Sequence, residues 1–229
     1  MAEETKSTIS VAEMEKAGVG FGHRVSKLHP KMNLYVSGVK NNVNIFDLEK
    51  TAKELERALK FIAKLAKEGK IIVFVGTKPQ LRDLIKSAAE DCKMPYVSER
   101  WLGGTFTNFL TLQKRVDYFK DLERKKSEGE LGKYTKKERL NFDREIESLR
   151  IKFEGVKNME KLPEAVFIVG IDKNMAVIQE AKRMGIKIIG VIDTNINPEV
   201  ADYPIPANDD AISSVTYILE KIKATIINK

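Results

Sequence analysis

The sequence predicts an α/β protein built on a doubly wound parallel sheet of about five strands. Five short apolar runs recur along the 229 residues, and most of them are unbroken rather than alternating. Strands buried on both faces of a parallel sheet have this composition, because helices cover both faces. Helical patterns lie between the runs, and alternating strands and helices are typical of a doubly wound sheet.

The expected elements follow in chain order. The strands are residues 71–75, 95–97, 165–169, 187–192 and 203–206. Apolar residues at helical spacing predict helices at residues 51–67, 81–89, 176–184 and 211–227. The last helix has a start signal, because Asn208, Asp209 and Asp210 offer capping oxygens just before it.

One segment interrupts the alternation. Residues 113–157 have no strand pattern, and 24 of these 45 residues are charged, 14 basic and 10 acidic. An apolar stripe runs from Phe109 to Leu122, and a second from Phe142 to Val156 has the 4-3-4-3 spacing of a coiled-coil seam. Two glycines between the stripes predict a turn. We therefore expect an antiparallel coiled-coil helical hairpin inserted into the sandwich and projecting from it.

The amino-terminal 47 residues differ from the rest. A short helix is expected at residues 11–17, a flexible basic loop at 18–24, and a small hairpin formed by 35–37 and 43–46. The connection of this hairpin is longer than the tight two-residue type. The predicted organisation has three parts. They are an amino-terminal part (1–47), an α/β/α sandwich (48–108 and 158–229) and the protruding hairpin (109–157).

Charge and composition bound the function. The net charge is +7 and the isoelectric point is near 9.2, which favours polyanionic partners, with nucleic acid first and an anionic membrane surface second. Cys92 is alone, so an intramolecular disulfide is excluded. Residues 1–8 lack the apolar core of a signal peptide, and no apolar run approaches the roughly 20 residues that cross a bilayer. We expect a cytoplasmic protein with no membrane partner.

Polar residues and glycines gather after several predicted strands, at the edge where enzymes of this fold hold ligands. Lys78 follows a strand and Gly76, and such a turn can hold a phosphate, although its spacing does not match a nucleotide-binding loop. Turns and helix caps need the same residue types, and no nucleophile–base set is evident. A nucleotide-binding or enzymatic protein using this edge is therefore an alternative function. A protein-interaction module acting through the hairpin is a third.

The two histidines, His23 and His29, do not have the spacing of a zinc site, so we expect no metal. His29 lies among basic residues, where a histidine can stack on or hydrogen-bond to a nucleic acid. The run from Arg100 to Phe109 contains the only tryptophan, Trp101, beside two adjacent glycines that permit a sharp bend.

This run, Arg-Trp-Leu-Gly-Gly-Thr-Phe-Thr-Asn-Phe, resembles the bacterial small-subunit ribosomal protein S-two family. Other segments match that family in the same order. They include Phe21-Gly-His-Arg24, Pro30-Lys-Met32, Phe74-Val-Gly-Thr-Lys78, Val191-Ile-Asp-Thr-Asn195 and Asn208-Asp-Asp-Ala211. The resemblance implies a flavodoxin-like sheet with a protruding coiled-coil hairpin, no catalytic activity and no cofactor. It also implies binding to 16S ribosomal RNA between head and body on the solvent side of the small subunit. Neighbouring small-subunit proteins would be partners and, in some bacteria, so would the mRNA-binding ribosomal protein S-one.

The chain departs from the family pattern at a few positions. Gly20 stands where relatives usually carry a histidine, so a metal or stacking role for that side chain is absent here. Gly170 and Ala207 also differ from the usual residues. Local charge and family position together predict a set of RNA-binding residues. They are Arg24, Lys27, His29, Lys31, Lys78, Arg100, Trp101 and Asn108.

Overall fold

A computed structural model describes residues 9–228, so the polar segment 1–8 lies outside the described residues. Five parallel strands form the central sheet in the order β5-β4-β6-β7-β8. They are β4 (Ile72–Gly76), β5 (Tyr96–Val97), β6 (Ala165–Val169), β7 (Lys187–Ile192) and β8 (Tyr203–Pro206). Counted along the chain this order is 2-1-3-4-5, which is the flavodoxin-like arrangement. The predicted fold class is confirmed, and three of the five strands have the expected bounds.

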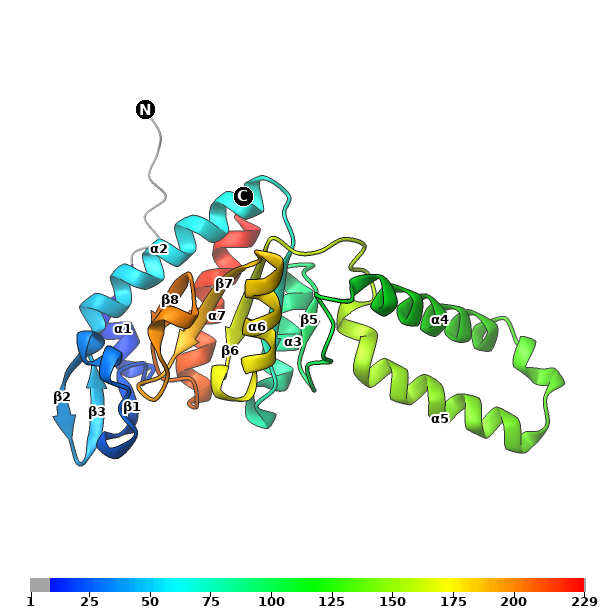
Figure 1. Ribbon diagram of the computed structural model, residues 1–229, viewed down its shortest axis with the longest axis horizontal. Coiled ribbons are helices and arrows are strands. Elements are labelled where there is room, and N and C mark those ends of the chain that lie inside the picture. Colours follow the sequence, from blue (N-terminus) through cyan, green and yellow to red (C-terminus); the bar gives the residue numbers. More distant parts are fainter. Residues whose placement is uncertain (1–8, 229) are drawn as a thin grey trace.

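Helices cover both faces of this sheet (Figure 1). The core on one face is built with α1 (Val11–Lys16), α2 (Leu48–Lys67), α3 (Arg82–Asp91) and α7 (Ile212–Ile227). On the other face, α6 (Met175–Met184) packs beside the loop that contains Trp101 and Phe106. Alternate residues of each strand enter opposite cores: Phe74 faces the first, while Val73 and Val75 face the second. Within residues 9–228, no helix is both long and apolar enough to cross a membrane.

The amino-terminal part contains a strand that the sequence analysis did not expect. β1 (Phe21–Arg24), β2 (Val36–Lys40) and β3 (Val43–Phe46) form an antiparallel sheet in the order β1-β3-β2. Residues 18–24, expected to be a flexible loop, thus include a strand that pairs with β3. The β2–β3 connection is also tighter than expected, because Asn41 and Asn42 both have positive φ and form a two-residue turn. Two short 3₁₀ helices, η1 (Val25–Lys27) and η2 (Pro30–Tyr35), connect β1 to β2.

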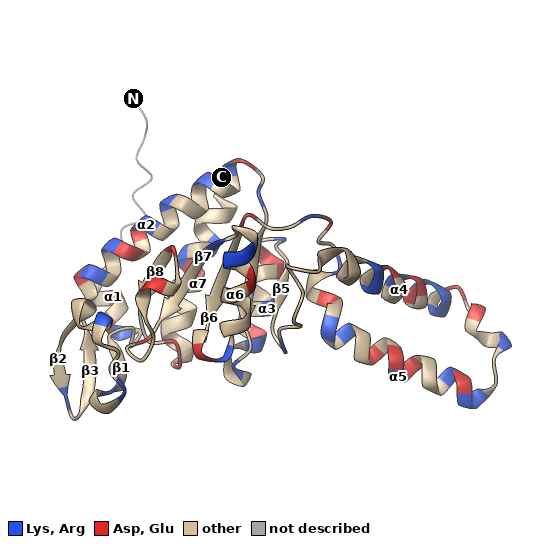
Figure 2. Cartoon of the chain, in the orientation of Figure 1, with Lys and Arg blue, Asp and Glu red and all other residues tan. Residues whose placement is uncertain are grey.

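Two long helices, α4 (Phe109–Ser127) and α5 (Lys136–Phe153), leave the sandwich side by side and are joined by η4 (Glu130–Lys133) (Figure 1). Val116, Phe119 and Ile146 are among the buried residues of this pair. Ion pairs join the two helices as well, including Lys126 with Asp143 at 2.6 Å. Figure 2 shows both signs of charge along the two helices, which leaves their outer faces polar. We call α4, η4 and α5 the arm.

Candidate functional site

The carboxyl edge of the sheet, where β4 and β6 end, is the place at which flavodoxin-like proteins hold ligands. The side chain of Lys78 occupies this place. It leaves the end of β4 and passes over Gly170, whose φ is +73°, so closely that a Cβ at Gly170 would lie 3.0 Å from the lysine stem. Lys78 is only 8% exposed. Its ammonium group lies 2.7 Å from Asp209 Oδ1, 2.8 Å from Asp210 Oδ1 and 3.9 Å from Asp172 Oδ1.

These carboxylates change what Lys78 can do. Burial raises the pKa of Asp209 to about 6, even though the adjacent ammonium opposes the rise. Burial acts in the same direction on Asp210, but the hydrogen bond and charge of Lys78 outweigh it and lower the pKa of that carboxyl. A lysine surrounded by three carboxyl groups does not attract a phosphate. The position between the ends of β4 and β6 is thus filled by the protein itself.

The neighbouring polar groups at this edge also bond to one another. Thr77 Oγ1 lies 3.2 Å from Asn174 Oδ1, and the Asn174 amide donates to the carbonyl oxygens of Val169 and Gly170. Asp209 and Asp210 do not cap α7 as the sequence suggested. Asn208 Oδ1 instead accepts from the backbone N–H groups of Asp210 and Ala211, just before α7 begins.

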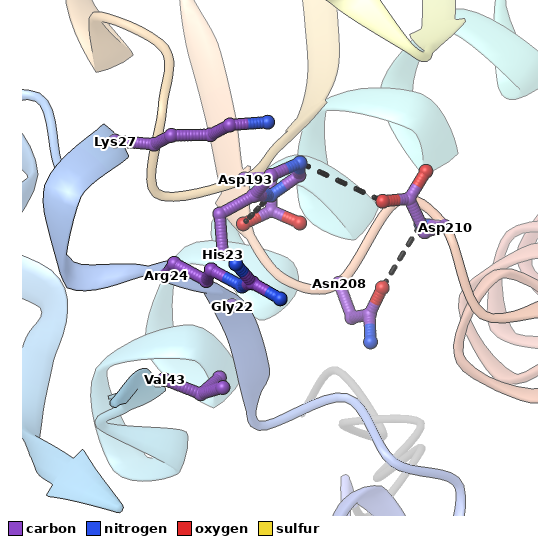
Figure 3. A pocket seen from close by; sticks show the side chains of 8 residues that line it. All are labelled: Gly22, His23, Arg24, Lys27, Val43, Asp193, Asn208 and Asp210. Atoms are coloured by element: carbon purple, nitrogen blue, oxygen red, sulfur yellow. Dashed lines mark hydrogen bonds and ion pairs between the residues drawn. The ribbon is translucent and has the colours of Figure 1, made fainter. Parts of the chain in front are cut away.

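His23 joins the small sheet to this edge (Figure 3). Its Nδ1 lies 3.0 Å from Asp193 Oδ1, after β7, and its Nε2 lies 3.6 Å from Asp210 Oδ2, before α7. The hydrogen bond to Asp193 raises the pKa of His23, although burial opposes this. The backbone N–H of His23 also donates to Thr194 Oγ1 at 2.9 Å. The small sheet is therefore fixed to the parallel sheet by contacts between residues that are far apart in the sequence.

The close contact between β1 and Thr194 requires a glycine at position 22. A Cβ at Gly22 would lie 2.5 Å from Thr194 Cγ2 and 3.3 Å from the backbone oxygen of Asn44. No side chain fits there without moving the strand away from Thr194. Gly22 thus permits the close approach that places His23 between its two carboxylates.

His23, Asp193 and Asp210 each offer one ligand atom. These atoms lie within 4.8 Å of one another, which is close enough for the three side chains to hold one metal ion. However, each member already has protein partners. Asp193 Oδ1 accepts from the backbone N–H and the hydroxyl of Thr194, and the second carboxyl oxygen of Asp210 is bound to Lys78. Gly20 is buried against Leu48 and offers no further ligand atom. The expectation of no metal stays a prediction.

Four of the predicted RNA-binding residues lie together on the segment that follows His23. Arg24 and Lys27 are exposed, and His29 is half-buried. The exposed Lys31 pairs with Glu199 and donates its backbone N–H to His29 Nδ1. The His29 backbone N–H donates in turn to the Thr194 carbonyl at 2.8 Å. We call residues 24–31 the basic segment; the bonds to Thr194 at His23 and His29 hold it in place.

The other four predicted residues are divided between surface and core. Arg100 and Asn108 are exposed, but Lys78 and Trp101 are buried, each only 8% exposed. The Trp101 indole packs edge-on against Phe106 with ring centroids 4.8 Å apart. Because neither Lys78 nor Trp101 reaches the surface on which RNA would lie, we leave both out of the RNA surface proposed below.

The partner of Trp101 is Glu180, a residue that the sequence analysis missed. Glu180 Oε1 accepts from the Trp101 indole N–H at 3.0 Å and from the Gly104 backbone N–H at 2.8 Å. Oε2 accepts from the backbone N–H groups of Phe106 and Thr107 at 2.9 and 3.2 Å. A signal was present in the sequence, because Glu180 shares the inward helical face of Val177 and Ala181, where a lone carboxylate needs buried donors.

Known proteins of one family resemble this chain over nearly its whole length. The family model described as "Ribosomal protein S2" matches residues 14–229. A protein of Rhodomonas salina named "Small ribosomal subunit protein uS2c" is 43% identical over 220 residues, which cover 96% of this chain and 90% of that protein. The protein of the same name from Guillardia theta is 43% identical over 219 residues, covering 96% and 93%. "Small ribosomal subunit protein uS2" of Coprothermobacter proteolyticus is 40% identical over 221 residues, covering 96% and 82%.

Proposed function

The chain belongs to the ribosomal protein S2 family, and we propose that it is a structural protein of the small ribosomal subunit that binds 16S rRNA through its basic segment. Its place would lie between head and body on the solvent side of the subunit. Members of this family are structural proteins and not enzymes. The edge of the sheet where β4 and β6 end agrees, because Lys78 fills the position between these two strands that a nucleotide or flavin would need.

The basic segment supports this proposal, because its cations face solvent and its backbone is fixed by hydrogen bonds. Arg24 and Lys27 are exposed, and no ion pair to either is formed within residues 9–228. Backbone hydrogen bonds to Thr194 hold the segment in place before any RNA is bound. A segment whose backbone is already fixed loses less conformational freedom when it meets RNA, so its contacts contribute more to affinity. Arg100 and Asn108, at the start of the arm, are further candidates.

We expect the double variant Arg24→Ala/Lys27→Ala to bind 16S rRNA about 10-fold or more weakly at moderate salt, because each lost phosphate contact removes counterion release. The slope of log affinity against log salt should fall by about one unit for each lost contact. Filter binding or fluorescence anisotropy with a 16S transcript, at several salt concentrations, measures both quantities.

Lys64→Ala/Lys67→Ala is the matched control, since it also removes two charges and both lysines are exposed at the far end of α2 from the small sheet. It should leave affinity and slope unchanged. Equal losses in the control and in the double variant would show that the basic segment has no special part in binding. Affinity of the unaltered protein that does not fall with salt would contradict the proposal as a whole.

We also propose that the arm supports protein partners, among them the mRNA-binding ribosomal protein S-one where it is present. Leu140 and Ile151 are 50% and 56% exposed on α5, and they lie about three turns apart on one side of the helix. Single exposed apolar side chains are common on protein surfaces, so the proposal is supported mainly by the projection of the arm away from the sandwich (Figure 1).

Deletion of residues 113–157, closed by a short linker, should abolish co-purification of protein partners and leave association with RNA largely intact. Pull-down from purified small-subunit proteins, run beside the rRNA binding assay, measures the two effects separately. Loss of RNA binding with retained protein partners would assign the arm to RNA instead.

A further inference from the structure

A pocket of about 350 Å³ opens between β1 and the loops that follow β7 and β8 (Figure 3). Its wall on the β1 side is formed by Gly22, His23, Arg24 and Lys27, and the opposite side by Asp193 and Asp210. The pocket is open to solvent at the basic segment, which is the surface proposed above to meet RNA. Its volume is near the lower end for small-molecule sites, where a single nucleotide fits but an ion alone would leave most of the space empty.

Both basic and acidic side chains line this pocket. Arg24 and Lys27 lie at the outer wall, and both are exposed. Across from them is the Asp210 carboxylate, which is 54% exposed and stays ionised because Lys78 holds it from behind. Asp193 is buried and engaged with His23 and Thr194, so its bonds are internal. Asp210 also has partners, Lys78 at Oδ1 and His23 at Oδ2, but its side chain is 54% exposed, so it is the carboxylate whose remaining lone pairs are open to a ligand.

We propose that this pocket binds one unpaired guanosine of RNA, with its phosphate at Arg24 and Lys27 and the donor edge of its base at Asp210. The inference rests on the proposed binding of RNA. A nucleotide offers a partner to both kinds of side chain, with an anionic phosphate at one end and base N–H donors at the other. Guanine alone among the four bases has two adjacent donors, N1–H and N2–H, for a carboxylate. Recognition of unstacked bases on their Watson–Crick edge is the usual way in which proteins read single-stranded RNA.

The test uses the full-length protein and labelled heptamers of uridine that carry guanosine, inosine or adenosine at the central position. Guanosine should bind about 10-fold more tightly than adenosine, since a bidentate contact to a base edge discriminates against a base that cannot form it. Inosine, which lacks the N2 amino group, should lie between the two. Fluorescence anisotropy at constant salt measures the three affinities.

Asp210→Asn should bring the guanosine and adenosine heptamers to equal affinity. The readout is the ratio of the two affinities, because Asp210 also contacts His23 and Lys78 and the absolute affinity can change with it. Asp172→Asn is the matched control, because Asp172 also lies near Lys78 but does not line the pocket. It should keep the preference. Thermal unfolding of both variants shows whether they are folded, and a variant that has lost its fold is replaced by Asp210→Ser.

Equal affinities for the three heptamers, with binding that still weakens as salt rises, would overturn the pocket proposal and leave general RNA binding in place. Preference that survives Asp210→Asn would overturn it as well. Free guanosine monophosphate that binds as tightly as the heptamer would assign the pocket to a nucleotide rather than to RNA. Failure of every heptamer and of the 16S transcript to bind would instead contradict the proposed function.

Discussion

Replacing Glu180 by alanine is expected to lower the free energy of unfolding by about 3–5 kcal/mol, which is a large part of the stability of an ordinary domain. The carboxylate accepts from the Trp101 indole and from backbone N–H groups of Gly104, Phe106 and Thr107. Alanine would leave these donors without their acceptor in a water-poor site, and each buried unsatisfied donor costs about 1–3 kcal/mol. The expected loss is smaller than the sum of these costs, because the loop can relax toward water.

Urea unfolding followed by tryptophan fluorescence measures this effect, and Trp101, the only tryptophan, reports directly on the site. Glu180→Gln should be intermediate, at about 2 kcal/mol, since an amide keeps one acceptor oxygen but loses the charge and introduces a donor among donors. Gln179→Ala is the control on the exposed side of the same helix and should change stability by less than about 0.5 kcal/mol. A loss below about 1 kcal/mol for Glu180→Ala would show that the loop is held by packing instead.

The pH dependence gives a second measurement on the same residue. Burial would raise the pKa of Glu180, but the hydrogen bonds from Trp101 and the loop outweigh it and hold the pKa below its ordinary value of 4.5. A depressed carboxyl pKa contributes stability that is fully present above 4.5 and is lost as the pH falls through the folded-state pKa. The difference in stability between the protein and Glu180→Gln should therefore narrow in acid below pH 4.5.

Glu180 also explains why the run from Arg100 to Phe109 has its sequence. The glycines permit a bend that aims several backbone N–H groups at one carboxylate, and Gly104 adopts a φ of +91° to do so. The bend leads directly into α4, so the carboxylate fixes the start of the arm. The sequence indicates this run and its junction with the arm, and it makes Trp101 a candidate for RNA contact as well as a support for the bend, but it does not identify the partner of the indole. The acceptor lies 79 residues further along the chain, and local patterns do not contain that pairing.

Across the whole fold, elements with a local signal in the sequence were predicted, and elements held by distant partners were missed. Strands such as Ala165–Val169 and Lys187–Ile192 were predicted residue for residue because a run buried on both faces is strongly apolar. β1 was missed because its four residues, Phe-Gly-His-Arg, have no strand composition and are held by partners elsewhere, among them Ile45 and Thr194. Lys78 was taken for a phosphate contact for a similar reason. Its place after a strand was visible in the sequence, but its carboxylate partners come from 131 and 132 residues away.

Lys78→Met is expected to destabilise the protein by about 3–5 kcal/mol at neutral pH, because removal of one partner of a buried ion pair leaves the other charge uncompensated. Methionine keeps most of the lysine stem that packs over Gly170, so the loss reports mainly on charge. The buried Asp209 carries this effect. Its pKa is already about 6 beside the ammonium, and it should rise further when the ammonium is absent.

The stability of Lys78→Met should depend on pH through Asp209. A carboxyl group whose folded-state pKa is above its ordinary value of 3.8 stabilises the folded protein when protonated, and that stability is lost as the pH rises through the folded-state pKa. Lys78→Met should consequently be least destabilised, relative to the unaltered protein, below about pH 5, and the difference should grow toward pH 8. Urea unfolding at intervals across this range measures the difference.

The double variant Lys78→Met/Asp209→Asn separates charge from shape. It removes the buried carboxylate together with its counter-ion, so it should recover about half or more of the lost stability and lose most of the pH dependence. The corresponding double variant Lys78→Met/Asp172→Asn should recover little of the lost stability, because Asp172 lies 3.9 Å from the Lys78 ammonium. If Lys78→Met/Asp209→Asn is no more stable than Lys78→Met at pH 8, the ammonium stabilises the fold through Asp210, which in turn contacts His23. The amino-terminal sheet would then be released, and the basic segment should lose RNA affinity without any change to its own residues.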